Sequence, residues 1–372
     1  MTDLLTSTAR RIAFAGYKNM NLGAARHFAA LGIGENEFFE WPVAKLAAIT
    51  GLKSSYFDDA KRAEAIQKGT TEAQFAINNG IKTLFFADDN YPSRMNDCDD
   101  APALLFCLGE AQEAAHAVSI VGTRHSTAYG LDFTRHLVED LAASLDSLLI
   151  VSGLAYGIDI AAHRAALSAG VPTGAVLAHG LNTIYPADHR NEARRMVKEG
   201  GFLMTEYPSY APIHKGNFLA RNRIVAAMAD VTVVVESDNK GGAMSTARIA
   251  GAYNREVMAL PGRITDTYSR GCNSLISRGE AIMVRDAGDI IDALGWKARP
   301  VEKKQQELPF LSPEQTQIAD FLKSKPDATV NDLCSGIGIP YSRLSALLFE
   351  MEMDDIVTAL PGGRYCLVNP DV

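Results

Sequence analysis

The sequence has few of the features that mark secreted, membrane-spanning or disulfide-stabilised proteins. Its five cysteines, at positions 98, 107, 272, 334 and 366, are odd in number and form no Cys-x-x-Cys pair. A disulfide framework or a structural zinc site is therefore not expected, and a reducing cytoplasm is the default compartment. No uncharged apolar stretch reaches the ~18 residues of a membrane span. The N-terminus lacks the basic and apolar regions of a secretory signal, so we expect a cytoplasmic protein.

The chain also lacks the net positive charge that is common among nucleic-acid-binding proteins. Its formal charge is −8 over 372 residues, and this charge is unevenly distributed. Residues 1–110 hold 11 basic and 14 acidic residues, residues 111–300 hold 19 of each, and residues 301–372 hold 6 and 11. A polyanion would therefore be bound by the central part of the chain, and the acidic ends are expected to serve another purpose.

The length and a hydrophobic content of 47% predict two or three folded domains. Residues 1–110 are expected to form a helical domain plus a connecting segment, because apolar residues recur at helical spacing over 22–31 and 37–49. The Thr-Gly-Leu turn at 50–52 resembles the turn of a helix-hairpin-helix or sterile-alpha-motif unit. A glycine that ends a helix explains the turn equally well, so a DNA contact there stays open.

The central region, residues 111–297, alternates apolar runs with helical patterns, which predicts an α/β fold with a doubly wound parallel sheet. The run 231–235 is β-branched throughout, as is typical of a strand buried on both faces. Strand-like segments at 82–86 and 103–108 precede this region. The strands expected within it are 117–121, 148–151, 174–177, 202–205, 231–235, 257–260 and 281–284.

The C-terminal region, residues 312–372, follows a charged, proline-containing linker at 298–311. Three helical patterns and a hairpin pattern predict a winged helix. Its third helix, 341–353, carries Arg343 against Glu350 and Glu352, and such a helix would repel phosphates. A protein contact or an autoinhibitory role is favoured over duplex binding. The apolar positions expected to fill its core are Leu344, Leu347, Leu348 and Met351.

Glycine-rich turns follow five of the predicted strands of the central region. In an open parallel sheet the carboxyl ends of the strands form the ligand crevice, where glycines and helix N-termini bind phosphate. Five such turns on one edge therefore predict an anion site. The candidate residues in these turns are Gly122, Thr123, Ser152, Gly153, Gly157, Gly180, Gly241, Gly242, Ser245 and Thr246.

Polar and basic side chains near these turns are the predicted phosphate-binding groups. Arg124 directly follows a strand, where a guanidinium can form two hydrogen bonds to a phosphate. Residues 221–223 are predicted to open a helix, where cations oppose the helix dipole, so a polyanionic ligand would account for them. The candidates of this kind are Arg124, Arg190, Arg221, Asn222, Arg223 and Lys240.

Patterns for catalysis and metal binding are missing from the sequence. Asp159 and His163 lie four residues apart on one predicted helix face, either as an acid–base couple or as a buried pair that packs the crevice floor. The interpretation as a buried packing pair is favoured. The histidines show no metal-ligand spacing, and the turns match neither a Walker A nor a G-x-G-x-x-G motif. No catalytic residue, metal or cofactor is therefore expected.

The order of these motifs closely resembles that of the DNA-processing protein A family, also called Smf or DNA-protecting protein. Three positions depart from the family pattern. Thr123 replaces a serine of the family's Gly-Ser-Arg turn, a mild change that keeps a hydroxyl. Leu219 replaces the proline of its Phe-Pro-x-Arg-Asn-Arg signature, which loosens that turn but leaves the charged residues, and His179 replaces a smaller residue of its Gly-x-Gly-Leu segment. The family's pocket arginine maps to Arg124. The matching segments include 120–124, 152–159, 205–208, 217–226, 241–247, 260–262 and 271–276.

The resemblance implies an extended Rossmann fold flanked by a sterile-alpha-motif-like domain and a winged helix. It implies a cytosolic bacterial protein of natural transformation that binds single-stranded DNA in a basic pocket and protects it from nucleases. It further implies a homodimer and the loading of a RecA-type recombinase as a partner.

Two other functional classes fit parts of the sequence. A phosphoribohydrolase-type enzyme would carry P-G-G-x-G-T-x-x-E, and aligning its first two glycines on 241–242 places Lys240, Met244 and Arg248 at the proline, the third glycine and the catalytic glutamate. The acid required for glycosidic chemistry is thus missing. A transcription regulator would use the winged helix, whose acidic third helix disfavours that function.

Overall fold

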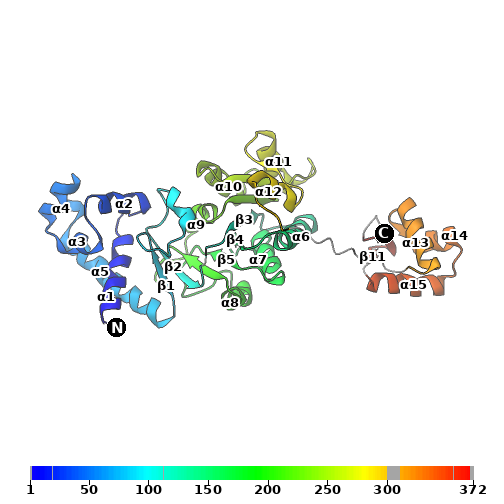
Figure 1. Ribbon diagram of the computed structural model, residues 1–372, viewed down its shortest axis with the longest axis horizontal. Helices are drawn as coiled ribbons and strands as arrows, with labels where there is room; N and C mark the ends of the chain where they lie inside the picture. The colour runs from blue at the N-terminus through cyan, green and yellow to red at the C-terminus, as the bar shows by residue number, and fades with distance from the viewer. Residues whose placement is uncertain (1, 19, 112, 300–310, 355, 369–372) are drawn as a thin grey trace. The chain divides into compact units, whose positions relative to one another are not determined.

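The computed structural model of the protein describes residues 2–18, 20–111, 113–299, 311–354 and 356–368. The chain divides into two compact units, residues 1–300 and 301–372 (Figure 1). Of the predicted linker at 298–311, residues 300–310 lie outside the described residues. No described helix combines the length and the apolar character needed to span a membrane.

A nine-stranded sheet forms the centre of the first unit, and the predicted doubly wound α/β fold is confirmed. The strand order is β1-β2-β6-β5-β4-β3-β7-β8-β9. Strands β3 to β9 pair in parallel, whereas β1 pairs with β2 and β2 with β6 in antiparallel fashion. The strand bounds are β1 Lys82–Phe85, β2 Leu104–Gly109, β3 His116–Gly122, β4 Leu148–Ser152, β5 Thr173–Val176, β6 Phe202–Thr205, β7 Val231–Val235, β8 Glu256–Ala259 and β9 Ile282–Met283.

The sheet begins before residue 111, where the sequence predicts the central region to start. Strand β2 pairs with β6 in a register that places Phe106 opposite Thr205. Side chains of β1 and β2, among them Phe85 and Phe106, also enter the core of the N-terminal helices. The helical region and the sheet therefore share a hydrophobic core at this edge.

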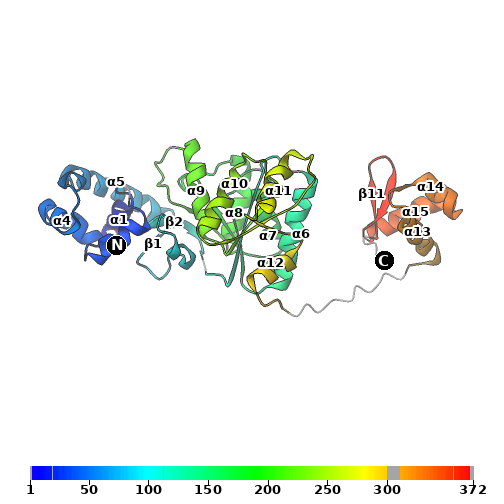
Figure 2. The same cartoon turned by 90° about the horizontal axis from the view of Figure 1, so that it is seen from above.

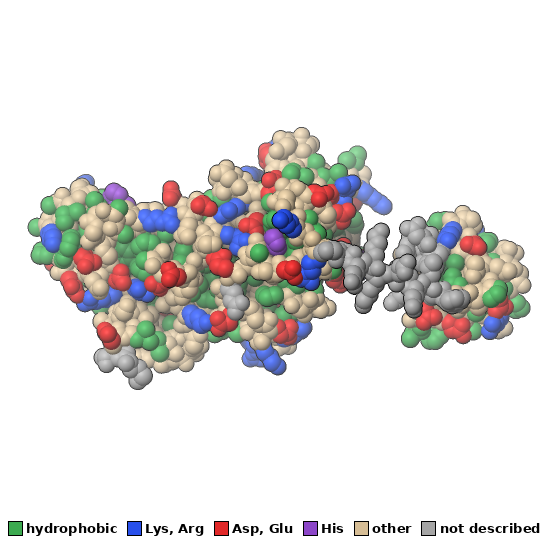
Figure 3. All heavy atoms as spheres, viewed as in Figure 1, with side chains coloured by type: hydrophobic (Ala, Val, Ile, Leu, Met, Phe, Trp, Pro, Cys, Tyr) green, Lys and Arg blue, Asp and Glu red, His purple; other side chains and the backbone are tan. Residues whose placement is uncertain are grey.

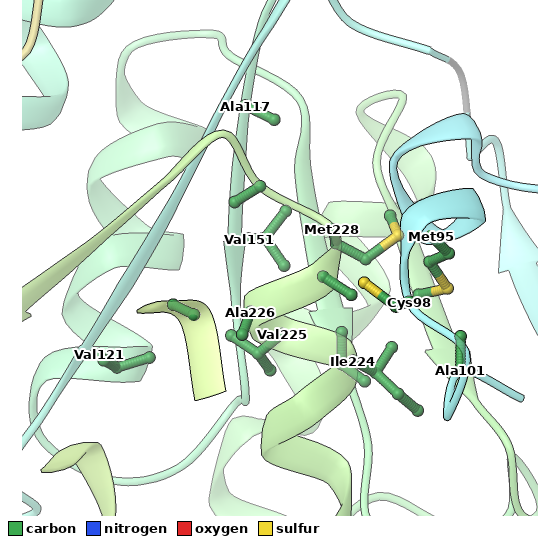
Figure 4. Close-up of a cluster of buried hydrophobic side chains, with 14 of the residues drawn as sticks. Met95, Cys98, Ala101, Ala117, Val121, Val151, Ile224, Val225, Ala226 and Met228 are labelled. Atoms are coloured by element: carbon green, nitrogen blue, oxygen red, sulfur yellow. The ribbon is translucent and has the colours of Figure 1, made fainter. Parts of the chain in front are cut away.

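Helices cover both faces of the sheet. Alternate residues of β3 point to opposite faces: Val118 and Ile120 pack with α6, α7 and α12, whereas Ala117 and Val121 pack with α9, α10 and α11. Figure 4 shows the second face, including Ile224 of α9 and Met228, which directly follows that helix. The bounds are α6 Ala128–Ser144, α7 Ile158–Ser168, α8 Arg190–Lys198, α9 Lys215–Ala227, α10 Gly242–Ala252, α11 Arg270–Ser277 and α12 Ala287–Leu294.

The N-terminal helices gather at the β1–β2 end of the sheet (Figure 2). Their core is aromatic, with Phe38 in edge contacts with the rings of Phe14 and Phe28. Pro42 divides the apolar pattern predicted at 37–49 into two helices, because proline has no amide hydrogen to continue the first. Gly51 ends α4 at a φ of 70°. The bounds are α1 Thr2–Ala15, α2 Leu22–Ala30, α3 Glu35–Glu40, α4 Val43–Thr50 and α5 Asp59–Asn78.

The second unit is the predicted winged helix. Its helices are α13 Pro313–Ser324, α14 Val330–Ile337 and α15 Tyr341–Met353, and its sheet has the order β10-β12-β11. The strands are β10 Ala328–Thr329, β11 Val357–Leu360 and β12 Arg364–Leu367, of which β10 was not predicted. The four apolar positions predicted for the core of α15 are buried there.

Candidate functional site

The carboxyl ends of β3 and β7 meet at a cavity of about 920 Å³. From β3 the chain proceeds through β4, β5 and β6 on one side, and then crosses to β7 on the other. Open α/β sheets bind their ligands at such a switch point, because the connections leave adjacent strands in opposite directions. We call this space the switch-point cavity.

Half of the predicted site residues line this cavity. They come from the turn after β3, from α9 and from the start of α10. Three helices begin around it, after Gly157, His214 and Gly241, and their first amide groups are free of intrahelical partners. The predicted residues that line the cavity are Gly122, Thr123, Arg124, Arg221, Asn222, Gly241, Gly242 and Thr246.

Arg124 presents an exposed cation to the cavity. Its side chain is exposed and forms no ion pair with any described residue. The guanidinium carbon lies 5.8 Å from the centre of the Phe218 ring, and this ring meets that of Tyr185 edge-on at 5.8 Å. The cavity thus combines a free guanidinium with two aromatic rings.

Arg221 has a structural position that the sequence did not predict. Its residue is 5% exposed, and its Nη1 donates hydrogen bonds to the carbonyl oxygens of Gly153, at 2.6 Å, and of Val176. Helix α9 begins at Lys215, so the prediction that residues 221–223 open a helix is wrong. Burial raises the pKa of Asp159, which also lines the cavity, and the charge of Arg221 opposes that rise.

The other predicted cations point elsewhere. Arg223 forms an ion pair with Glu206, and both side chains are largely buried. Arg190 lines a separate cavity of about 490 Å³, beside Ile184 and Leu203. Lys240 is exposed in the loop between β7 and α10 but is not among the residues that line the switch-point cavity. Of the predicted cations, Arg124 alone is both exposed and in the cavity wall.

Comparison with known proteins decides the family. The profile described as DNA recombination-mediator protein A matches residues 82–295. The chain belongs to this family. A second profile, the DprA winged helix domain, matches residues 302–363. The resemblance drawn from the order of the motifs is confirmed.

Relatives of this recombination-mediator family have sequences and structures similar to the chain. It is 35% identical over 281 residues to protein Smf of Escherichia coli strain K12, covering 73% of this chain and 74% of that protein. The X-ray structure of DNA processing protein A from Streptococcus pneumoniae matches with a TM-score of 0.62 and 30% identity, over 76% of this chain and 95% of that one. A Helicobacter pylori DNA processing protein A, whose structure is described by its single-stranded DNA binding mode, matches with a TM-score of 0.51 and 33% identity, over 57% and 95% of the two chains.

The remaining predicted residues do not line the switch-point cavity. Ser152 is buried, and its hydroxyl donates to the carbonyl oxygen of Ile120 at 2.6 Å. Gly157 has a φ of 77°, and a Cβ there would overlap the carbonyl oxygen of Thr123. Gly153, Gly180 and Ser245 are likewise absent from the cavity lining.

Several residues of the cavity were not among the predicted site residues. Lys215, at the start of α9, is a second exposed cation without an ion pair to a described residue. Tyr268 stacks on His125 with ring centres 6.2 Å apart. These residues lie in or beside irregular loops, where no periodic pattern marks a functional side chain. Only folding brings them to the ends of β3 and β7.

Asp159 and His163 do not form an acid–base couple. The Nδ1 atom of His163 lies 2.7 Å from Oγ1 of Thr173, and burial lowers the pKa of His163 to about 3. Asp159 instead accepts a hydrogen bond of 3.4 Å from the amide of Ala155. The packing interpretation of this pair therefore fits the structure. Within the described part of the chain, no group of three or more His, Cys, Asp or Glu side chains is placed to hold a metal ion.

Proposed function

We propose that this protein binds single-stranded DNA in the switch-point cavity and takes part in DNA processing during natural transformation. The carrying observation is Arg124, an exposed cation that forms no ion pair with a described residue and lies beside the rings of Phe218 and Tyr185. A guanidinium binds phosphate, and aromatic faces accept unstacked bases of any sequence. The single-stranded DNA binding mode described for the Helicobacter pylori relative supports this ligand.

Binding without hydrolysis is the activity we infer. Met244, where the phosphoribohydrolase pattern has its third glycine, is buried, and Arg248 stands in place of the catalytic glutamate. The cavity offers Arg124 and Lys215 together with the N-termini of α9 and α10. These groups favour a negatively charged ligand.

A homodimer through the β9 edge is part of this proposal. Strand β9 ends the sheet, and its two residues, Ile282 and Met283, are 46% and 44% exposed. Exposed apolar side chains on an unpaired sheet edge favour pairing with a second copy. Leu275 of α11, by contrast, is buried at 1% exposure. Two copies would offer one strand two cavities.

We further propose that the protein is located in the cytoplasm and has a RecA-type recombinase as a partner. All five cysteines are free thiols, which supports a reducing compartment. Loading of a RecA-type recombinase is proposed on the family resemblance alone.

Fluorescence anisotropy with labelled single-stranded and duplex oligonucleotides, titrated at several salt concentrations, tests this function. We expect tighter binding to the single strand, and we expect Arg124→Ala to weaken it by about 1–3 kcal/mol. Arg194→Ala is the matched control, since Arg194 is exposed, forms no ion pair with a described residue and lies outside the cavity. Equal affinity of the Arg124 and Arg194 variants would contradict the proposal.

A further inference from the structure

A second basic groove lies on the N-terminal helical region. It is a cavity of about 810 Å³ between α1, the short 3-10 helix η1 (Ser54–Tyr56) and α5. We call it the lysine groove and define it by Lys18, Lys53, Lys61, Lys68, Tyr56 and Tyr210. We propose that the lysine groove binds the phosphate backbone of the same single strand and extends the contact beyond the switch-point cavity. This proposal rests on the proposed function.

The charges of the lysine groove are nearly all positive. Glu64 is the one acidic residue among those that line it, and it pairs with Lys68 at 2.7 Å. Lys18, Lys53 and Lys61 are exposed and form no ion pair with any described residue. On the face of this unit that Figure 3 shows, by contrast, basic and acidic side chains are interspersed. A concave surface that concentrates one sign of charge attracts a polyanion.

Two tyrosines give the lysine groove aromatic surfaces. The hydroxyl of Tyr56 donates to the carbonyl oxygen of Lys18 at 2.8 Å, and burial raises the pKa of this tyrosine to about 12, so its ring stays neutral. Tyr210 is 55% exposed. Cations interleaved with aromatic rings are typical of surfaces that bind single strands without sequence preference, because phosphates meet the cations and bases stack on the rings.

One loop joins the lysine groove to the switch-point cavity. Tyr210 lines the groove, while Ile213 and His214, farther along the same β6–α9 loop, line the cavity. Three residues of chain span at most about 11 Å, so the two spaces lie close together along this loop. Glu72 of α5 holds the loop, accepting hydrogen bonds of 2.8 and 2.7 Å from the amide and hydroxyl of Ser209. A continuous strand therefore has a short path between them.

The test compares two variants of the full chain. The groove variant is Lys18→Ala/Lys53→Ala/Lys61→Ala. The control variant is Lys198→Ala/Lys297→Ala/Lys323→Ala, which removes the same charge from exposed lysines that line neither space. Each is titrated with single strands of about 6 and about 30 nucleotides, the first near the lower limit of single-strand site sizes. Thermal unfolding followed by circular dichroism confirms that both variants fold.

We expect the groove variant to bind the long strand roughly tenfold more weakly and to reduce its salt slope by about 2, at ~0.7 per lost phosphate contact. The short strand, held in the switch-point cavity, should bind both variants equally. Equal affinity of the two variants for the long strand would overturn the proposal. A second pair of results would also overturn it. If removing the groove lysines from the full chain leaves the long-strand affinity unchanged, and deleting residues 301–372 raises that affinity only when these lysines are present, then the acidic unit and not DNA occupies the groove.

Failure of the proposed function gives a different result. In that case Arg124→Ala leaves short-strand binding unchanged, whatever the lysine variants do. A wild-type protein that binds neither strand overturns both proposals.

Discussion

The guanidinium group of Arg221 donates a hydrogen bond to the carbonyl oxygen of Gly153, 2.6 Å away and 68 positions earlier in the chain. A second hydrogen bond from the same nitrogen reaches the carbonyl oxygen of Val176. These bonds connect α9 with the carboxyl ends of β4 and β5. The buried Arg221 therefore packs against the strand ends at the switch-point cavity, whereas the exposed Arg124 lines the same cavity and forms no ion pair with a described residue.

Substituting Arg221 should cost stability first. We expect Arg221→Ala to lower the free energy of unfolding by about 2–4 kcal/mol, because two buried carbonyl groups lose their donor and the buried Asp159 loses a nearby positive charge. Urea denaturation measures this, with Arg124→Ala as the control that stays within about 0.5 kcal/mol of the wild type. A variant with wild-type stability and lost DNA binding would show that Arg221 contacts the ligand.

Gly157 is expected to tolerate no side chain. We predict that Gly157→Ala destabilises the protein more than Gly279→Ala does, although both glycines have a left-handed φ, at 77° and 69°. The difference, about 1–3 kcal/mol, comes from the overlap of the new Cβ with the backbone of Thr123, whereas Gly279 faces open space. Denaturation midpoints of the two variants make the comparison, and equal midpoints would contradict it.

His163 should make the protein sensitive to mild acid. Its pKa is lowered by burial from 6.5 to about 3, so between these values the unfolded chain binds a proton that the folded chain does not. Stability therefore falls as the pH drops below about 6.5, by about 2 kcal/mol between pH 7 and pH 5. Burial also lowers the pKa of His179. Urea titrations of wild type and His163→Gln at both pH values separate the contributions of the two histidines. If the free energy of unfolding falls as much between pH 7 and pH 5 in His163→Gln as in wild type, the role of His163 is refuted.

The edge strand β9 should control assembly. We expect Ile282→Asp to convert a dimer into a monomer, because a charge on an exposed apolar edge cannot be buried against a second copy without a partner. Light scattering at micromolar concentration is the measurement. Leu4→Asp is the matched control, an exposed apolar residue of α1 far from β9 in sequence. A wild-type protein that is already monomeric would contradict the dimer.

Deleting residues 301–372 should leave single-strand binding intact or strengthen it. The removed segment holds 6 basic and 11 acidic residues, so its loss lowers repulsion of a polyanion. Anisotropy titrations at two salt concentrations measure the effect. A tenfold loss of affinity, about 1.4 kcal/mol, would show that the winged helix itself binds DNA.

The sequence by itself determined the alternation of strands and helices, the winged helix and the edge of the sheet at which the candidate site lies. Each of these depends on local periodicity and on glycine turns, which neighbouring residues specify. The strand Val231–Val235 could be predicted for this reason, since a run of β-branched residues strongly favours a strand.

Only the tertiary structure decided which cations line the cavity and which strands pair at the edge of the sheet. Arg124 and Arg221 both belong to segments that match the family, yet Arg124 is exposed and Arg221 is buried, with an exposed fraction of 5%. The difference arises because Gly153 and Val176, far away in the chain, place their carbonyl oxygens around Arg221. The lysine groove is likewise assembled from α1, η1, α5 and the loop at Tyr210. Contacts between such distant segments depend on packing, which no local pattern encodes.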